Sequence, residues 1–377
     1  MAASYYNDYS RPDKESGRSL PMLFVDGCMS VLTLLVCTAL LLTLAVPFVA
    51  PSRIFFFPLL GLLAPAVYVA AVLLALYWII RWRWIRAGAL LFVLLLGSCN
   101  VPLFYRMQLR RDYGEPEYGR GTFKVMTYNV RAFYGDDRQS SVDRIAGVLE
   151  EEAPDIVCLQ EYNPVLAHRS EAFVRWMEGY AVAGSQGASD NSPIVILSKF
   201  PIIRSDTLDA FGGAIWADLR IGEDTVRVFS NHLHTTEIKA YDDEFLSQRL
   251  FLTDSTRWSK MRSILHRHRK NSELRAEQVD RIAPAIAATQ TRYIVCGDFN
   301  DTPMSYVYRT MARGSKDAFS EAGKGYSHTF RGFLRTLRID YVLRSEGLEA
   351  LSYEVPEAAC SDHLPVVVRM QKRDLNP

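Results

Sequence analysis

The chain has 377 residues, 49% of them hydrophobic, which is enough apolar material for a sizeable core and excludes a disordered protein. Its formal net charge of +1 gives no sign of the pervasive basic surface that is typical of proteins binding long nucleic acids. The charges are unevenly spread, because residues 1–105 carry only seven Lys/Arg and four Asp/Glu.

Three uncharged apolar segments follow a polar tail of residues 1–26, at residues 27–50, 54–80 and 87–105. Each reaches the ~20 apolar residues that a helix needs to cross a hydrocarbon layer, so we predict three transmembrane helices within residues 27–105. A cleaved signal peptide is the alternative, but its apolar region is usually ~7–15 residues long and is not followed by further apolar segments. The stretch "LLGSC" also resembles a lipoprotein processing site, although it lies far from the N-terminus.

The positive charges predict an orientation for these helices. Lys and Arg precede the first segment and lie between the second and third, at residues 11–18 and 81–86, whereas Arg53 is the single charge between the first and second. If the basic stretches stay in the cytoplasm, the protein is a multi-pass membrane protein with residues 106 onward on the extracytoplasmic side. The basic residues 106–111 favour the opposite orientation. Residues 106–121, rich in charge, Gly and Pro, read as a linker to the next domain.

Residues 122–377 form that domain, in which short β-branched runs are separated by polar turns. A helical repeat of apolar residues predicts helices at 141–152 and 171–180, and a longer one within 241–290. The six cysteines have no repeated spacing, so we expect free thiols. The predicted strands are "FKVMTYNV", "DIVCLQE", "PIVILS", "TVRVFSNHL", "RYIVCGDFN", "RIDYVLR" and "LPVVVRM".

Polar side chains stand at the ends of several of these strands. Taken singly, each has an ordinary explanation, because Asn and Asp commonly end strands and a lone His is more often structural than catalytic. Together they suggest a site, since antiparallel pairing of the last two strands with the first four would bring all of them to one sheet edge. Four strands carry such residues at their C-terminal ends and two at their beginnings: Asn129, Glu161, His232, Asp298 with Asn300, then Asp340, and Asp362 with His363.

In this order the stretches "TYNVR", "LQE", "SNHLH", "GDFND", "RIDYVL" and "SDHLP" resemble the endonuclease/exonuclease/phosphatase superfamily over residues 122–370. Its members include apurinic endonucleases, pancreatic deoxyribonuclease, neutral sphingomyelinases and inositol polyphosphate 5-phosphatases. The resemblance implies an α+β fold, a four-layer α/β/β/α sandwich of two mixed β-sheets. It also implies metal-dependent hydrolysis of a phosphate ester.

The resemblance further implies a role for each residue of the set. Glu161 and Asn129, helped by Asp362, would hold the cation; this is expected to be magnesium (Mg²⁺), with Mn²⁺ as the alternative, because hard cations prefer such oxygen ligands. His363 would be the general base for the attacking water, oriented by Asp340. Three residues would act on the phosphoryl group: Asp298 and Asn300 by orienting it, and His232 by stabilising the transition state or protonating the leaving oxygen.

The substrate class stays open at the level of sequence. A membrane anchor suits a lipid or another small phosphoester, whereas a nuclease acting on DNA or RNA shares the same catalytic residues. An inactive membrane-anchored binding protein is a further alternative, which the presence of Glu161, Asp298 and His363 disfavours. No protein partner is predicted.

Overall fold

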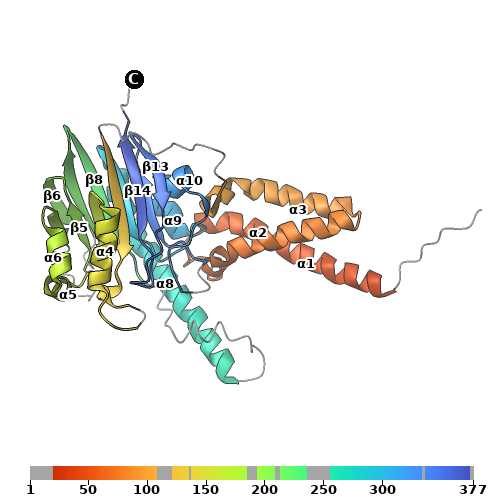
Figure 1. The fold of residues 1–377 in the computed structure, drawn as a ribbon. Coiled ribbons are helices and arrows are strands. Elements are labelled where there is room, and N and C mark those ends of the chain that lie inside the picture. The colour runs from red at the N-terminus through yellow and green to blue at the C-terminus, as the bar shows by residue number, and fades with distance from the viewer. Residues whose placement is uncertain are drawn as a thin grey trace, which may run out of the picture.

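The computed structural model describes residues 20–107, 121–135, 137–184, 193–208, 213–235, 255–332 and 336–373. Within these ranges the chain has two parts, a domain of stacked β-sheets and a bundle of three helices that projects from it (Figure 1).

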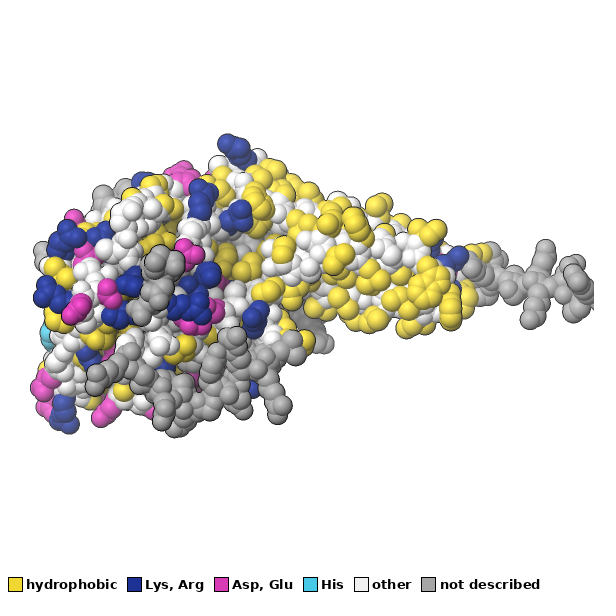
Figure 2. Space-filling view, turned by 90° about the horizontal axis from the view of Figure 1, so that it is seen from above, with side chains coloured by type: hydrophobic (Ala, Val, Ile, Leu, Met, Phe, Trp, Pro, Cys, Tyr) yellow, Lys and Arg dark blue, Asp and Glu magenta, His cyan; other side chains and the backbone are white. Residues whose placement is uncertain are grey.

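The projecting bundle contains the three apolar segments. Its helices are α1 (Leu20–Ala45), α2 (Phe57–Ile80) and α3 (Trp84–Gly97), with the 3₁₀ turns η1 (Val46–Phe48) and η2 (Ser98–Leu103) at their ends. The spans Pro21–Phe48, Phe57–Ile80 and Trp84–Leu103, the first and third of which include the adjoining 3₁₀ turns, are long and apolar enough to cross a membrane. Hydrophobic side chains cover the bundle in Figure 2, while most charged side chains lie on the sheet domain.

The first helix extends further toward the N-terminus than the charge-free segment predicts, since α1 already includes residues 20–26. Asp26 is tolerated there because Arg81 binds its carboxylate through two nitrogens, at 3.2 and 3.0 Å. Tyr77 donates a third hydrogen bond to the same group. Pairing with Arg81 and Tyr77 offsets the cost of a charged side chain in this apolar helix.

Two six-stranded mixed sheets make up the other part, as predicted. The first sheet has the order β13-β14-β2-β3-β5-β4 and the second the order β10-β12-β9-β8-β7-β6. The strands of the first sheet are β2 (Thr122–Asn129), β3 (Ile156–Gln160), β4 (Ala181–Gly184), β5 (Val195–Ser198), β13 (Leu348–Glu354) and β14 (Val366–Lys372). Those of the second are β6 (Ile202–Thr207), β7 (Ala214–Ile221), β8 (Asp224–His232), β9 (Arg292–Asp298), β10 (Lys316–Asp317) and β12 (Asp340–Arg344).

The sheets pack face to face, and helices cover both outer faces. Val125, Ile156, Val228 and Cys296 belong to one fully buried cluster between the sheets. On the first sheet lie α4 (Val142–Glu152), α5 (Pro164–Arg169) and α6 (Glu171–Met177); on the second lie α8 (Ser255–Ala287) and α9 (Tyr306–Met311). The short α10 (Ala318–Ala322) contributes to the core between the sheets. The predicted four-layer α/β/β/α sandwich is confirmed.

The strand directions bring the predicted polar ends together. Strand β2 is parallel to β3, and β8 is parallel to β9. Strand β14 runs antiparallel to β2, and β12 runs antiparallel to β9. The beginnings of β12 and β14 therefore lie at the same edge as the C-terminal ends of the other four. In the second sheet, Asp298 pairs in register with Asp340 on one side and with His232 on the other.

The helical bundle is bonded directly to the sheet domain. The guanidinium of Arg338 donates to the carbonyl oxygen of Leu103 at 2.9 Å, and Ser320 Oγ donates to that of Pro102 at 3.2 Å. Next to them, β1 (Tyr105–Arg106) pairs antiparallel with β11 (Gly325–Tyr326). Part of the predicted linker is thus a strand, while residues 108–120 lie outside the described ranges.

Candidate active site

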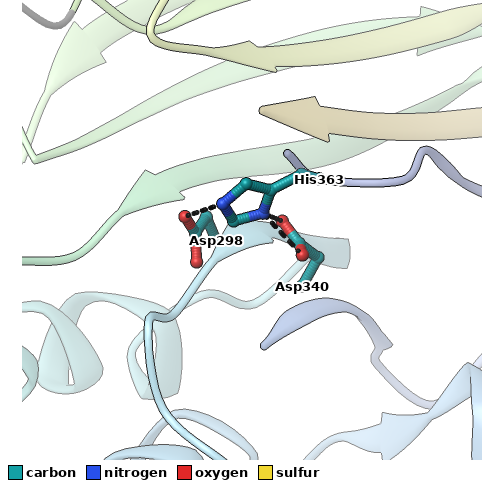
Figure 3. A group of neighbouring side chains, drawn as sticks. All are labelled: Asp298, Asp340 and His363. Carbon is teal, nitrogen blue, oxygen red and sulfur yellow. Dashed lines mark hydrogen bonds and ion pairs between the residues drawn. The ribbon is translucent and has the colours of Figure 1, made fainter. Parts of the chain in front are cut away.

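At the shared sheet edge, His363 lies between two buried carboxylates (Figure 3). Its Nδ1 is 3.0 and 3.2 Å from the two oxygens of Asp340, which confirms that the pair is within hydrogen-bond reach. Its Nε2 lies 3.7 Å from Asp298 Oδ2. Asp340 therefore binds Nδ1 of the imidazole, and Nε2 points toward the carboxylate of Asp298.

Two further residues hold the loop that presents His363. Ser361 Oγ donates to the carbonyl oxygen of Asn129 at 2.8 Å and accepts from the backbone N–H of His363 at 3.2 Å. The ring of Phe330 packs edge-on against the imidazole, with centroids 5.1 Å apart. These contacts restrict the ring to one orientation, as a preorganised base requires.

The turns that end β3 and β9 are conformationally strained. Glu161 and Asn300 have φ of 53° and 51°, in the left-handed region that residues other than Gly rarely adopt. Such strain recurs at functional sites, where the surrounding structure maintains it. Gly297 has φ of 133°, and a Cβ there would lie 2.0 Å from Asn231 O, so the "GDFN" stretch requires glycine.

A hydrogen-bond network joins these turns. The amide nitrogen of Asn129 donates to Glu161 Oε1 at 3.1 Å and to Asp298 Oδ2 at 3.0 Å. The side chain of Asn300 donates to the same Asp298 oxygen at 3.1 Å. The side-chain oxygen Oδ1 of Asn129 accepts from the backbone N–H of Arg131 at 3.0 Å. In this arrangement Asn129 positions the carboxylates of Glu161 and Asp298. That Asn129 binds a metal through its side-chain oxygen stays a prediction.

His232 stands beside the same two carboxylates. Its Nε2 lies 3.6 Å from Glu161 Oε1 and 3.9 Å from Asp298 Oδ2. Among the described residues this buried nitrogen has no hydrogen-bond partner. A buried polar atom without a partner is uncommon, so Nε2 is available to a ligand that binds beside Glu161 and Asp298.

Burial and charge perturb the pKa values of the cluster. Burial lowers the pKa of His363, but the neighbouring Asp340 and Asp298 outweigh it and raise that pKa to about 10. Burial, with a smaller contribution from Asp340, raises the pKa of Asp298 to about 6, against the opposing effect of His363 and His232. Negative charge is therefore crowded at this edge, which favours the arrival of a cation.

Five of the predicted residues line a single cleft. Glu161 and Asp298 share it, as predicted, together with Asn300, Asp362 and His363. Asn129, His232 and Asp340 are not among its lining residues, but each lies beside one that is. Asp362 also lies 3.5 Å from Arg131 Nε across an ion pair. Sequence reasoning did not assign the cleft residues that come from other elements, which are Leu62 of α2, His268 and Arg275 of α8, Thr235, Asp301, Thr302, Phe330, Leu337 and Ile339.

The donor set fits a hard divalent cation. Asp298, Asp340 and His363 offer ligand atoms that all lie within 4.8 Å of one another. Within this group, Asp340 already binds His363. Glu161 lies outside the group, but its side chain is 30% exposed and lies near Nε2 of His232. Carboxylate oxygens next to a partly open cleft are the ligands that Mg²⁺ and Mn²⁺ prefer.

A two-sheet sandwich with carboxylate, amide and imidazole groups at one edge is the arrangement that the sequence motifs predict. Residues 126–363 match the Endonuclease/Exonuclease/phosphatase family. Because this match covers more than half of the chain, the protein belongs to that family. Residues 26–103 match a domain of unknown function (DUF8431). A comparison with curated proteins gave no match.

Solved structures with similar folds come from several bacteria. An endonuclease/exonuclease/phosphatase from Beutenbergia cavernae is 17% identical, with 67% of this chain and 72% of that chain covered and a TM-score of 0.47. A family protein from Bacteroides thetaiotaomicron is 16% identical, covering 68% and 96% with a TM-score of 0.49. A mannosyl-6-phosphatase from the same species is 17% identical, covering 66% and 99% with a TM-score of 0.47.

Proposed function

We propose that this protein is a membrane-anchored, divalent-metal-dependent hydrolase that cleaves a phosphate ester, most simply a phosphodiester, by attack of water on phosphorus. The observation that carries the proposal is the contact between His363 Nδ1 and Asp340 in a cleft shared with Glu161 and Asp298. A base oriented by a buried carboxylate, beside groups able to hold a cation, suits this reaction better than a protein nucleophile.

In the proposed reaction, Nε2 of His363 accepts a proton from the attacking water. Asp340 accepts a hydrogen bond from Nδ1–H, which leaves Nε2 as the basic nitrogen and stabilises the imidazolium that forms. A divalent cation held by Glu161, when bound, supplies positive charge that neutralises the phosphoryl oxygens and favours the neutral form of the imidazole.

The remaining polar groups act on the phosphoryl group and the leaving oxygen. Asn300 and Asn129 fix the carboxylate of Asp298 by hydrogen bonds of 3.1 and 3.0 Å, so that Asp298 orients the water or the phosphoryl group near His363. His232 has a free Nε2 among the described residues and supplies either a proton to the leaving oxygen or a hydrogen bond to the pentavalent transition state.

The anchor in this proposal is the bundle α1–α3. Its three helices are apolar enough to cross a membrane, and the turn with Arg81 and Arg83 lies at the end of the bundle away from the sheets (Figure 1). By the preference of Arg for the cytoplasmic side, this arrangement favours an extracytoplasmic sheet domain.

The test is a substrate panel with the full chain in detergent micelles. A generic aryl phosphodiester, an aryl phosphomonoester, a phospholipid, duplex DNA and RNA are assayed with Mg²⁺, with Mn²⁺ and with chelator, for the wild type and for Glu161→Ala and His363→Ala. Turnover that requires the metal and both side chains supports the proposal. Turnover that survives chelation, or that survives both substitutions, refutes the mechanism. The absence of turnover on every substrate favours the binding-protein alternative, and cleavage of DNA or RNA alone identifies a nuclease.

A further inference from the structure

A second hollow opens directly beside the catalytic cleft and runs along helix α2. The two share the lining residues Leu62, Thr302 and Leu337, so they adjoin. On one side the hollow is lined by successive turns of α2, and on the other by residues 302–303 and 336–338 of the sheet domain. We call it the α2 groove.

The α2 groove is apolar. Leu63, Val69 and Leu73 line it and are 43%, 59% and 61% exposed. Among its described lining residues, the one charged side chain is Arg338, which is buried and ion-paired with Asp317 at 2.8 Å. The groove therefore offers a hydrocarbon-like surface with its own charge neutralised.

Its length matches one leaflet of a bilayer. The lining residues of α2 extend from Leu62 to Leu73, which at the helical rise of ~1.5 Å per residue is about 16 Å. Half of a ~30 Å hydrocarbon core is about 15 Å. With α2 across a membrane, the groove would run from the catalytic cleft at the headgroup level to roughly the middle of the bilayer.

The lining of the α2 groove, and not its size, distinguishes it from a site for a small soluble molecule. Its volume of about 590 Å³ lies within the ~300–1,000 Å³ of typical small-molecule pockets. One wall is α2, a helix able to span a membrane. With α2 in a bilayer, the groove would be next to lipid tails and away from polar solutes.

The contact that forms the junction is close and fixed. Gly61 lies against the sheet domain, where an added Cβ would be 2.6 Å from Met304 O, and Thr302 Oγ1 donates to Gly61 O at 3.4 Å. The close packing of the α2 backbone on the loop after β9 thus fixes the position of the groove relative to the cleft.

We infer that the substrate is a membrane phospholipid, whose phosphate enters the cleft of His363 while an acyl chain lies in the α2 groove. This inference rests on the proposed function and adds the substrate class to it. In this arrangement the lipid reaches the cleft laterally from the leaflet and keeps its tail in an apolar environment during hydrolysis.

The test compares two esters with the same scissile bond. One is a long-chain diacylglycerol ester of p-nitrophenyl phosphate, and the other is the deacylated glycerol ester of p-nitrophenyl phosphate. The full chain, reconstituted in lipid nanodiscs with Mg²⁺, is assayed as wild type, as Val69→Trp inside the groove, and as Val72→Trp, which changes a 46% exposed valine of α2 that is not among the groove residues.

We expect the wild type to hydrolyse the diacyl ester with a kcat/KM at least about tenfold above that of the glycerol ester. Val69→Trp should lower kcat/KM for the diacyl ester about tenfold and leave that for the glycerol ester unchanged, which also reports that the variant is folded. Val72→Trp should change neither. Leu73→Trp and its control Leu76→Trp repeat the comparison at the deep end of the groove.

Equal kcat/KM values of the wild type for both esters would overturn the inference, as would equal effects of the groove and control variants. Either result leaves the proposed hydrolase standing, because the glycerol ester is still cleaved. If neither ester is cleaved, the inference fails, and the substrate panel described above decides separately whether the proposed hydrolase stands.

Discussion

The substitution Asp340→Asn removes one buried charge next to His363 while keeping the size of the side chain. Opposite charges 3.0 Å apart interact by about 5 kcal/mol at an effective dielectric constant of ~20. If the transition state carries an imidazolium at His363, loss of this interaction lowers kcat by about 10³–10⁴-fold, since ~1.4 kcal/mol is a factor of ten. The carboxamide of the Asp340→Asn variant can also donate a hydrogen bond to Nδ1, which favours the ring tautomer that carries its proton on Nε2 and cannot act as the base.

The pH dependence separates this role from a merely structural one. Asp340 is one of the two carboxylates that raise the pKa of His363, so its removal lowers that pKa. A base acts when neutral, and the rising limb of the pH–rate profile should therefore move to lower pH in Asp340→Asn while the plateau falls. The assay is hydrolysis of an aryl phosphodiester between pH 5 and 10 at saturating Mg²⁺.

Asp218→Asn is the matched control, because it also changes a buried carboxylate of the second sheet, in strand β7 outside the cleft. It should lower stability and leave the position of the pH–rate profile unchanged. An Asp340→Asn variant that is folded and retains kcat within threefold, or that retains the pH profile of the wild type, would refute the assignment of His363 as the base.

Three further results are expected. Glu161→Gln should reduce kcat/KM about 100-fold or more and weaken Mg²⁺ binding in calorimetry, since a cation ligand loses its charge; unchanged binding would assign the metal elsewhere. Burial raises the pKa of Asp218, but Arg227 and Arg204 outweigh it and lower that pKa, so the stability from this cluster is present above about pH 4 and is lost as the pH falls further; thermal unfolding of wild type and Asp218→Asn should therefore converge in acid. Gly297→Ala should destabilise by more than about 2 kcal/mol because of its positive φ and crowding, while Gly147→Ala on open α4 should stabilise by about 0.5–1 kcal/mol; equal melting temperatures would contradict this.

The sequence predicts the central strands well, because β3 and β9 are almost wholly buried and β2 and β8 are buried along their C-terminal halves, with polar residues at the ends of all four. It predicts the edge strands poorly. In β13 the pairing register shifts between Ala350 and Ser352, and this irregularity breaks the alternation on which recognition of a strand depends.

Strand β7 was missed for a different physical reason. Its inward residues alternate regularly, but Asp218 on the other face looks like a solvent-exposed residue. Arg227 and Arg204 bind that carboxylate at 2.7–2.9 Å and bury it. A tertiary ion pair of this kind has no local signal in the sequence.

The residues of the candidate site also fall into those that the sequence predicts and those that it does not. The strand-end residues could be found from sequence because strand polarity alone brings them to one edge. The contributions of Leu62 and Arg275 could not, since they depend on how α2 and α8 pack against the cleft. The α2 groove is likewise a product of that packing and has no motif of its own.

The central claim is that water, activated by His363 beside a bound cation, attacks phosphorus. Its most direct test is a single turnover of an aryl phosphodiester in ¹⁸O-labelled water, with the full chain, Mg²⁺ and enzyme in excess. We predict that one ¹⁸O atom enters the phosphate product with the wild type, and that His363→Ala forms this product at least about a thousandfold more slowly. A first-turnover phosphate product without label would show that water attacks carbon and not phosphorus, and an undiminished rate with His363→Ala would remove the histidine from the mechanism; either result would contradict the account.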